Sequence, residues 1–355
     1  MTTAFDPIDL AGTRLANRIA MAPMTRSRAN GQDATPTAAV AEYYAQRASA
    51  GLIISEGVHP VAEGQGYPNT PGLHSREQIA AWREVTTAVH ERGGRIFAQL
   101  MHSGRIGHPD ILDGDLHPVG PSPVAAAGQV YTHEGPKGFL PPRELTGDQV
   151  REAVAGFASA ARNAVEAGFD GVEIHGANGY LIQQFLASGS NHRTDEWGGS
   201  VENRIRFAVE VVRAVAAEIG PERTGLRISP ANTLNDISET DTDELYTALL
   251  TAIEPVGIAY LHVLETAPER RPLVLDLRKR FAGTFILNPA TEGETDAASL
   301  ALIEDGVTDL VAYGRLFIAN PDLPARLRHD GPYNTLDSAT MYAGGDRGYI
   351  DYPAL

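Results

Sequence analysis

Short apolar runs rich in β-branched residues alternate along the chain with longer segments whose apolar residues recur at helical spacing. This alternation is typical of parallel strands joined by helical crossovers. Eight such runs favour a closed (β/α)8 TIM barrel, with an open, doubly wound sheet as the alternative. The runs are Arg18–Met24, Leu52–Ser55, Arg95–Leu100, Gly171–His175, Gly225–Ser229, Tyr260–Leu264, Thr284–Leu287 and Asp309–Tyr313.

Capping signals mark where several of the helices begin and end. A side-chain oxygen before a helix accepts a backbone N–H of its first turn, and glycine often ends a helix because it readily adopts a left-handed backbone. Helices are therefore expected to start at Thr35-Pro36, at Ser75 with Gln78 and at Thr146 with Gln149, and to end at Gly93 and Gly168.

One segment interrupts this rhythm. Met101–Leu145 separates the third expected strand from its helix and is rich in glycine and proline. A loop of this length in a compact domain is usually functional, so we expect a hairpin or lid over one barrel mouth. We find no repeat or linker, and predict a single domain over residues 1–355, with residues 101–145 as a lid excursion within it.

Polar side chains follow the expected strands, and the carboxyl ends of the strands form the active site in (β/α)8 barrels. Thr25, Gln99 and Arg227 are an alcohol, an amide and a fixed cation, a set that suits a flat heterocycle edged with carbonyl and N–H groups. Gly314 and Arg315 follow the last strand, where such barrels bind phosphate. Taken singly, each residue could instead make a structural contact at the rim.

The segment GFDGVEIHGANGYLIQQFL, residues 168–186, is the most informative. His175 ends a strand, and Asn178 follows on the loop. A neutral imidazole and an amide can both donate to one carbonyl oxygen and stabilise the enolate charge that develops when hydride adds at the β carbon, each donor contributing about 2.7–4 kcal/mol. Tyr180 opens a helix, and a phenol stays protonated at neutral pH, so it can protonate the α carbon. The alternative is a structural histidine and a packed aromatic.

Charge and composition narrow the classes of function. With 29 basic and 45 acidic side chains the net charge is -16, which repels nucleic acid, so an anionic ligand requires a local arginine cluster. The absence of cysteine excludes disulfides, iron–sulfur clusters and thiolate zinc sites. The histidines lack zinc-site spacing, and His262 with Glu265 is an isolated pair, so no metal is expected.

Two further features concern location. The N-terminal residues lack the apolar stretch of a signal peptide, and no apolar run approaches the ~20 residues of a membrane span. We therefore expect a cytoplasmic protein without membrane contacts, present as a monomer or a small homo-oligomer.

Motifs along essentially the whole chain resemble those of the Old Yellow Enzyme family of flavin-dependent ene-reductases. They are NRIAMAPMTRSRA near the start, SEG at 55–57, QLMHSGR at 99–105, VEIHGANGYLIQQFL at 172–186, SNHRTDEWGGSVENRIRF at 190–207, RISP at 227–230, YGRLFIANPDLP at 313–324 and the terminal GYIDYP. The resemblance implies a (β/α)8 barrel with non-covalent FMN, reduced by NADPH or NADH.

The resemblance also implies a role for individual residues. Met101 stands where many relatives have tryptophan, so a flexible thioether should open or reshape the substrate pocket. The residues that match the family's contacts to the FMN ring are Pro23, Met24, Thr25, Gly57, Gln99 and Arg227, and those at the phosphate are Asn288, Gly314 and Arg315. The residues that match the catalytic positions are His175, Asn178 and Tyr180. The residues that match positions bordering the substrate are Tyr67, Met101 and Tyr342, together with His175 and Asn178.

The expected reaction is reduction of the activated C=C bond of an α,β-unsaturated carbonyl or nitro compound by NAD(P)H. Hydride passes from flavin N5 to the β carbon and Tyr180 protonates the α carbon, in a ping-pong mechanism because both ligands share one site. Two alternatives remain. One is a flavin-free lyase or isomerase that uses His262, Glu265 and Arg315, and the other is a non-catalytic flavoprotein.

Overall fold

The computed structural model describes residues 2–293 and 295–355; residues 1 and 294 of the predicted domain range lie outside this part. Eight parallel strands form a closed barrel, in which the last strand pairs with the first. This closure confirms the predicted (β/α)8 barrel and excludes the open sheet. The strands are β3 (Ile19–Met21), β4 (Leu52–Val58), β5 (Ile96–Leu100), β10 (Gly171–Gly176), β11 (Thr224–Ile228), β12 (Tyr260–Leu264), β13 (Thr284–Asn288) and β14 (Leu310–Tyr313).

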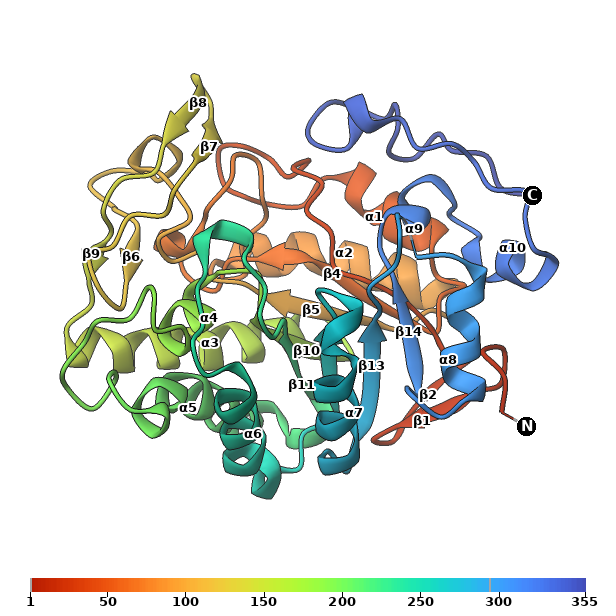
Figure 1. Cartoon of the computed structure of the whole chain (residues 1–355). Coiled ribbons are helices and arrows are strands. Elements are labelled where there is room, and N and C mark those ends of the chain that lie inside the picture. The colour runs from red at the N-terminus through yellow and green to blue at the C-terminus, as the bar shows by residue number, and fades with distance from the viewer. Residues whose placement is uncertain (1, 294) are drawn as a thin grey trace.

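Helices surround the barrel and cover the outer face of its strands (Figure 1). Their apolar faces pack with the outward-facing strand residues in one continuous core. Among the described residues no helix is both long and apolar enough to span a bilayer. The helices are α1 (Ala38–Gln46), α2 (Arg76–Glu91), α3 (Gly147–Glu166), α4 (Leu181–Leu186), α5 (Val201–Ile219), α6 (Thr242–Ile253), α7 (Arg271–Arg280), α8 (Ala301–Glu304), α9 (Arg315–Ala319) and α10 (Leu323–His329).

The capping signals hold at two helices. Both α2 and α3 begin with a full capping box, in which the hydroxyl and the amide side chain each accept a backbone N–H. Glycines in the left-handed region follow both helices, as expected. The residues are Ser75 with Gln78, Thr146 with Gln149, Gly93 (φ 78°) and Gly168 (φ 89°).

The start predicted at Thr35-Pro36 is wrong. Helix α1 begins at Ala38, with Thr37 in the N-cap position. The hydroxyl of Thr35 instead donates to Asp33, at 2.7 Å, and the backbone N–H of Thr35 donates to the same carboxylate. Thr35 therefore belongs to the preceding turn, because its side chain is already used there.

The interior of the barrel is apolar at its amino end and polar at its carboxyl end. A hairpin of β1 (Ile8–Leu10) and β2 (Thr13–Leu15), which the strand pattern did not predict, packs Leu10 and Leu15 into the apolar layer. The polar layer contains buried Gln99, Glu173 and His262. The barrel interior therefore carries buried polar side chains in one layer and apolar side chains in the other.

The long excursion after β5 carries a hairpin, as predicted. Strands β7 (Gln129–Thr132) and β8 (Gly135–Gly138) pair in antiparallel fashion, and β6 (Val119–Gly120) pairs with β9 (Arg143–Glu144) at its base. Figure 1 shows the hairpin and the C-terminal segment on the same side of the barrel, at opposite edges of one mouth.

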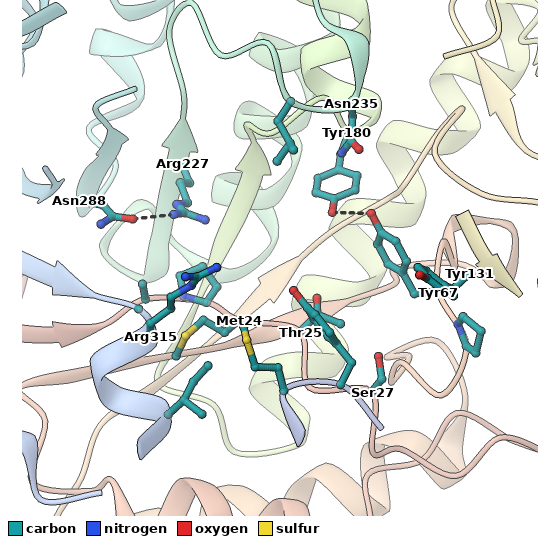
Figure 2. Close-up of a pocket in the computed structure, with 18 residues that line it drawn as sticks. Met24, Thr25, Ser27, Tyr67, Tyr131, Tyr180, Arg227, Asn235, Asn288 and Arg315 are labelled. Carbon is teal, nitrogen blue, oxygen red and sulfur yellow. Dashed lines mark hydrogen bonds between the residues drawn. The ribbon is translucent and has the colours of Figure 1, made fainter. Parts of the chain in front are cut away.

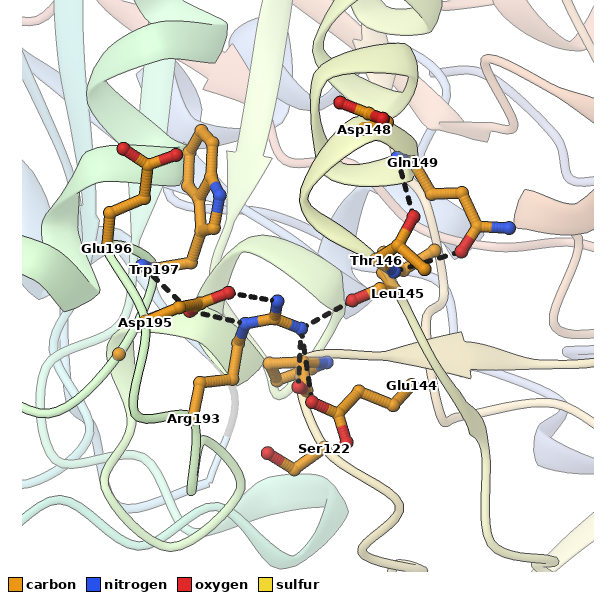
Figure 3. A network of polar contacts seen from close by, with 12 residues as sticks. Ser122, Glu144, Leu145, Thr146, Asp148, Gln149, Arg193, Asp195, Glu196 and Trp197 are labelled. Carbon is orange, nitrogen blue, oxygen red and sulfur yellow. Dashed lines mark hydrogen bonds and ion pairs between the residues drawn. The ribbon is translucent and has the colours of Figure 1, made fainter.

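A single buried arginine ties the base of the excursion to the loop after α4. Arg193 donates to the carbonyl oxygens of Pro121 and Leu145, which belong to the excursion, and forms a bidentate pair with Asp195 (Figure 3). Because a buried guanidinium needs most of its donors satisfied, this geometry fixes the middle and the C-terminal end of the excursion to the loop after α4.

The capping box of α2 provides a test of helix stability. Ser75→Ala should lower the free energy of unfolding by about 1 kcal/mol, because it leaves the N–H of Gln78 without its acceptor. Urea unfolding followed by circular dichroism measures the change. Thr87→Ala removes a hydroxyl from an exposed position of the same helix and should change stability by less than about 0.5 kcal/mol; an equal loss in both variants contradicts the capping role.

Candidate active site

A cavity of ≈ 860 Å³ opens at the carboxyl end of the barrel. Figure 2 shows Arg227, Asn288 and Arg315 on one side of it, Tyr180 and Tyr67 on the other. Ten of the residues singled out in the sequence line its wall: Pro23, Met24, Thr25, Tyr67, Tyr180, Arg227, Asn288, Gly314, Arg315 and Tyr342. Segments far apart in the chain therefore meet at one site.

Five predicted residues stand behind or beside the wall and are not part of its lining: Gly57, Gln99, Met101, His175 and Asn178. Each of the last two is in contact with a wall residue. The ring of His175 lies 5.1 Å from that of Tyr180, and the carbonyl of Asn178 accepts a hydrogen bond from Asn235 at 2.7 Å.

Hydrogen bonds in the loop after β10 determine which atom of the Asn178 side-chain amide can bind a ligand. Asn178 adopts a left-handed backbone (φ 58°), which asparagine tolerates better than most residues. Its Oδ1 accepts a hydrogen bond from Asn232 at 2.8 Å, and its backbone N–H donates to Ser229. Since the oxygen is engaged, the Nδ2 group is the part of the amide that can donate to a ligand.

His175 is held in the neutral state. Burial, and then the positive charge of Arg227, lower the pKa of His175 well below its usual value. Its Nδ1 atom is buried and has no hydrogen-bond partner among the described residues. A neutral imidazole carries one N–H, so His175 can donate a hydrogen bond without bringing a charge into the cavity.

Tyr180 is held in the protonated state. Its hydroxyl lies 3.0 Å from the hydroxyl of Tyr67, and its ring is almost completely buried (Figure 2). Burial, and then proximity to Tyr67, raise the pKa of Tyr180 well above its usual value. The phenol keeps its proton at neutral pH, as a general acid requires.

The polar side of the cavity fits a flavin. Arg227 donates to Oδ1 of Asn288 at 3.3 Å, while its buried Nε has no partner among the described residues and needs an acceptor. Gln99 donates Nε2 to Glu173 at 2.8 Å, which leaves its carbonyl oxygen to accept from a ligand N–H. The Arg227 cation, which lines the cavity, and the carbonyl oxygen of Gln99 are the kinds of group that the imide edge of an isoalloxazine would need.

Met101 and Gly57 form one packing unit. A Cβ atom at Gly57 would lie 2.7 Å from the sulfur of Met101, so the methionine occupies the space that the glycine leaves free. Met101 is buried in a cluster with Ile106, Ala126 and Tyr180. Met101 therefore belongs to the same apolar cluster as the proton-donor candidate.

His262 and Glu265 do not form the isolated acid–base pair considered from the sequence. His262 binds Glu173 through Nδ1 at 2.8 Å, whereas Glu265 forms a bidentate pair with Arg271. Among the described residues no three His, Asp or Glu side chains are grouped in a way that could hold a metal ion.

Sequence reasoning identified Tyr342 of the C-terminal segment but missed its neighbour Met341 as part of the wall. Met341 lines the cavity next to Tyr342. Arg26 donates to the carbonyl oxygens of Met341 and Gly348, and Arg28 donates to that of Thr340. The other lining residues missed are Ala22, Ser27, Pro68, Tyr131, Leu234, Asn235 and Ile318. The terminal GYIDYP motif was the only available signal, because carbonyl anchoring leaves no mark in the sequence.

Stacked planar groups hold this segment in place. The rings of Tyr43 and Tyr349 stack with their centroids 4.3 Å apart. The guanidinium of Arg47 lies 3.7 Å from the centroid of Tyr43, and that of Arg28 lies 4.4 Å from the centroid of Tyr349. A four-layer cation–π stack therefore joins the C-terminal segment to α1 and to the loop after β3.

Comparison with known proteins places these features in context. The sequence profile of the NADH:flavin oxidoreductase / NADH oxidase family matches residues 3–334. The chain is 42% identical to 12-oxophytodienoate reductase 1 of Oryza sativa subsp. japonica, over 98% of this chain and 92% of that protein.

Two solved structures superpose on this chain with TM-scores of 0.94. One is the old yellow enzyme homologue from Zymomonas mobilis, at 40% identity and 100% coverage of both chains. The other is morphinone reductase in complex with tetrahydroNAD, at 41% identity and 100% and 98% coverage.

Glu56, on β4, supports the cavity wall and generates a pH-dependent prediction. It accepts the backbone N–H of Arg26, next to Thr25, and burial raises the pKa of its carboxyl to about 7. The folded state therefore binds this proton more tightly than the unfolded state. The resulting stabilisation, on the order of 3 kcal/mol, is complete below pH 4.5 and disappears as the pH rises through 7.

Glu56→Gln should remove this component of the pH dependence. The unfolding free energy of the wild type relative to that of Glu56→Gln should fall between pH 5 and pH 8, as measured by urea denaturation. Glu84→Gln, an exposed control on α2, should keep the wild-type profile. A constant difference between wild type and Glu56→Gln across this range contradicts the prediction.

Proposed function

Because this chain belongs to the NADH:flavin oxidoreductase / NADH oxidase family, among its Old Yellow Enzyme members, we propose that it reduces the activated C=C bond of α,β-unsaturated carbonyl or nitro compounds. As a member of this family it is an NAD(P)H-dependent flavin ene-reductase. The observation that carries the proposal is a protonated Tyr180 in the cavity wall, with the ring of a neutral His175 5.1 Å from its own and the Asn178 amide oriented by Asn232 on the same loop.

FMN would be held without a covalent bond, since the chain has no cysteine for a thioether link. Gln99 and Arg227 would bind the imide edge of the ring, with Thr25 beside it. Pro23, Met24 and Gly57 are assigned to the ring by family resemblance, and Asn288, Gly314 and Arg315 to the phosphate. Bound FMN would supply the redox chemistry, taking a hydride from the reduced nicotinamide and passing it to the β carbon of the substrate.

His175 and Asn178 would hold the oxygen of the substrate. Two neutral donors stabilise the negative charge that develops there more than they stabilise the carbonyl of the ground state. Because His175 is neutral, it does not lose its proton to the developing charge and acts as a fixed hydrogen-bond donor. His175 at the end of β10 and Asn178 on the loop that follows would together set the distance from the oxygen to the reacting carbons.

Tyr180 would give its proton to the α carbon. The hydroxyl of Tyr67, at 3.0 Å, can donate to the phenolate oxygen that remains and so limits the cost of proton loss in a buried site. Tyr67, Met101 and Tyr342 would border the substrate, with Met101 in the apolar cluster that also contains Tyr180.

The nicotinamide and the unsaturated substrate would use the same cavity in turn, which gives ping-pong kinetics. A panel of enones assayed with NADPH and with NADH determines the preferred reductant. Yellow colour of the purified protein separates this proposal from a flavin-free lyase or isomerase. Turnover of cyclohexenone with either nicotinamide separates it from a non-catalytic flavoprotein.

The oxygen site can be tested with phenols, which occupy it as phenolates and give a long-wavelength charge-transfer band with bound flavin. His175→Ala combined with Asn178→Ala should abolish this band and lower kcat/KM for enones by at least 10²-fold, because both donors are lost. His133→Ala, at an exposed position of the β7–β8 hairpin, should keep both. An unchanged band in the double variant refutes the assignment.

The proton donor can be tested by following the two half-reactions separately in stopped-flow experiments. Tyr180→Phe should leave flavin reduction by the nicotinamide near the wild-type rate and slow enone reduction by about 10²–10⁴-fold, because only the second step needs the proton. Tyr333→Phe, outside the cavity lining, should change neither step. Equal slowing of both half-reactions in Tyr180→Phe rejects the role of Tyr180.

A further inference from the structure

A buried carboxylate lies inside the barrel, beneath the cavity, and the mechanism above does not use it. Glu173 is fully buried on β10, and its two oxygens accept three hydrogen bonds from neighbouring strands. Gln99 on β5 donates to Oε1 at 2.8 Å. Tyr260 donates to Oε2 at 3.2 Å, and Nδ1 of His262 lies 2.8 Å from the same oxygen. The carboxylate therefore connects β5, β10 and β12 across the interior.

The contact between Tyr260 on β12 and Glu173 on β10 requires a residue without a side chain on the intervening strand β11. Gly225 on β11 pairs in register with both Glu173 and Tyr260. A Cβ atom at Gly225 would lie 2.2 Å from the phenol ring of Tyr260, which no packing adjustment of a rigid ring accommodates. The glycine thus lets the Tyr260 ring cross β11 and bring its hydroxyl to Glu173.

Glu173 keeps its charge in this setting. Burial raises the pKa of Glu173, but the hydrogen bonds from His262 and Gln99 and the positive charge of Arg227 outweigh burial and hold the pKa below its usual value. Burial lowers the pKa of His262, so the imidazole is neutral and donates its Nδ1 proton to the carboxylate. One negative and one positive charge, Glu173 and Arg227, therefore remain in the polar layer.

We propose that Glu173 is a positioning residue that sets the midpoint potential of bound FMN. It holds the Gln99 amide in one orientation, and its negative charge opposes the positive charge of Arg227. This inference rests on the proposed function, since it needs FMN in the cavity. Reduction adds negative charge to the ring, which Arg227 stabilises and Glu173 opposes. Two unit charges several ångströms apart in a buried site interact by more than 1 kcal/mol, so loss of this carboxylate has a measurable effect.

The test is the midpoint potential of bound FMN, measured by dye-coupled reductive titration of the holoenzyme. Glu173→Gln keeps the size and one acceptor oxygen and removes the charge. At the wild-type midpoint the ratio of reduced to oxidised FMN should rise about tenfold or more, a positive shift of about 30 mV for a two-electron couple. Glu173→Asp retains the charge and should stay closer to the wild type than Glu173→Gln does.

Glu265, directly after β12, provides a matched control. Glu265 is also buried at the end of β12, but it pairs with Arg271 and contacts neither Gln99 nor Arg227. Glu265→Gln should leave the potential at the wild-type value. A wild-type potential in Glu173→Gln, or an equal shift in Glu265→Gln, overturns the inference.

Tyr260→Phe, a milder variant, tests the same inference if Glu173→Gln does not fold. Tyr260→Phe removes one donor from the carboxylate and leaves its charge less screened, so the potential should shift in the negative direction. An unchanged or more positive potential overturns the inference. A wild-type protein that binds no FMN in a fluorescence titration contradicts the proposed function instead, so the two failures are distinguishable.

Discussion

Closure of eight parallel strands into one barrel is the constraint on which the rest of the structure depends. A parallel barrel has all its carboxyl ends at one rim, so residues that are distant in the sequence must become neighbours there. Thr25, Arg227 and Arg315 come from three different strand ends and face one cavity for this reason. At the amino end, Leu10 and Leu15 pack into an apolar layer of the barrel interior.

Burial of charge determines how the polar layer is built. Ions inside a protein are costly unless their donors and acceptors are satisfied, and the layer meets this condition with few charges. Glu173 has three partners, and His175 and His262 are kept neutral by burial. Arg227 lines the cavity, and its buried Nε has no partner among the described residues.

The mouth of the cavity is formed by segments that the barrel does not specify. Arg193 fixes the excursion that bears the β7–β8 hairpin, and Arg26 and Arg28 fix the C-terminal segment. In each case an arginine binds backbone carbonyl oxygens, so the position of the segment depends on main-chain geometry. The side chains of the segment that face the ligand can therefore change without loss of these hydrogen bonds. Such an arrangement allows substrate preference to vary while the barrel stays the same.

The sequence by itself determined the strands, the capping boxes and the residue types at the strand ends, because periodicity, local hydrogen bonding and chain order are short-range properties. It also carried the family motifs around His175, Asn178 and Tyr180. Only the tertiary structure decided that Thr35 belongs to a turn, that His262 pairs with Glu173 and not with Glu265, and that Met341 reaches the cavity. Those outcomes depend on which side chains meet across the barrel, and contacts between residues far apart in the chain leave no local pattern.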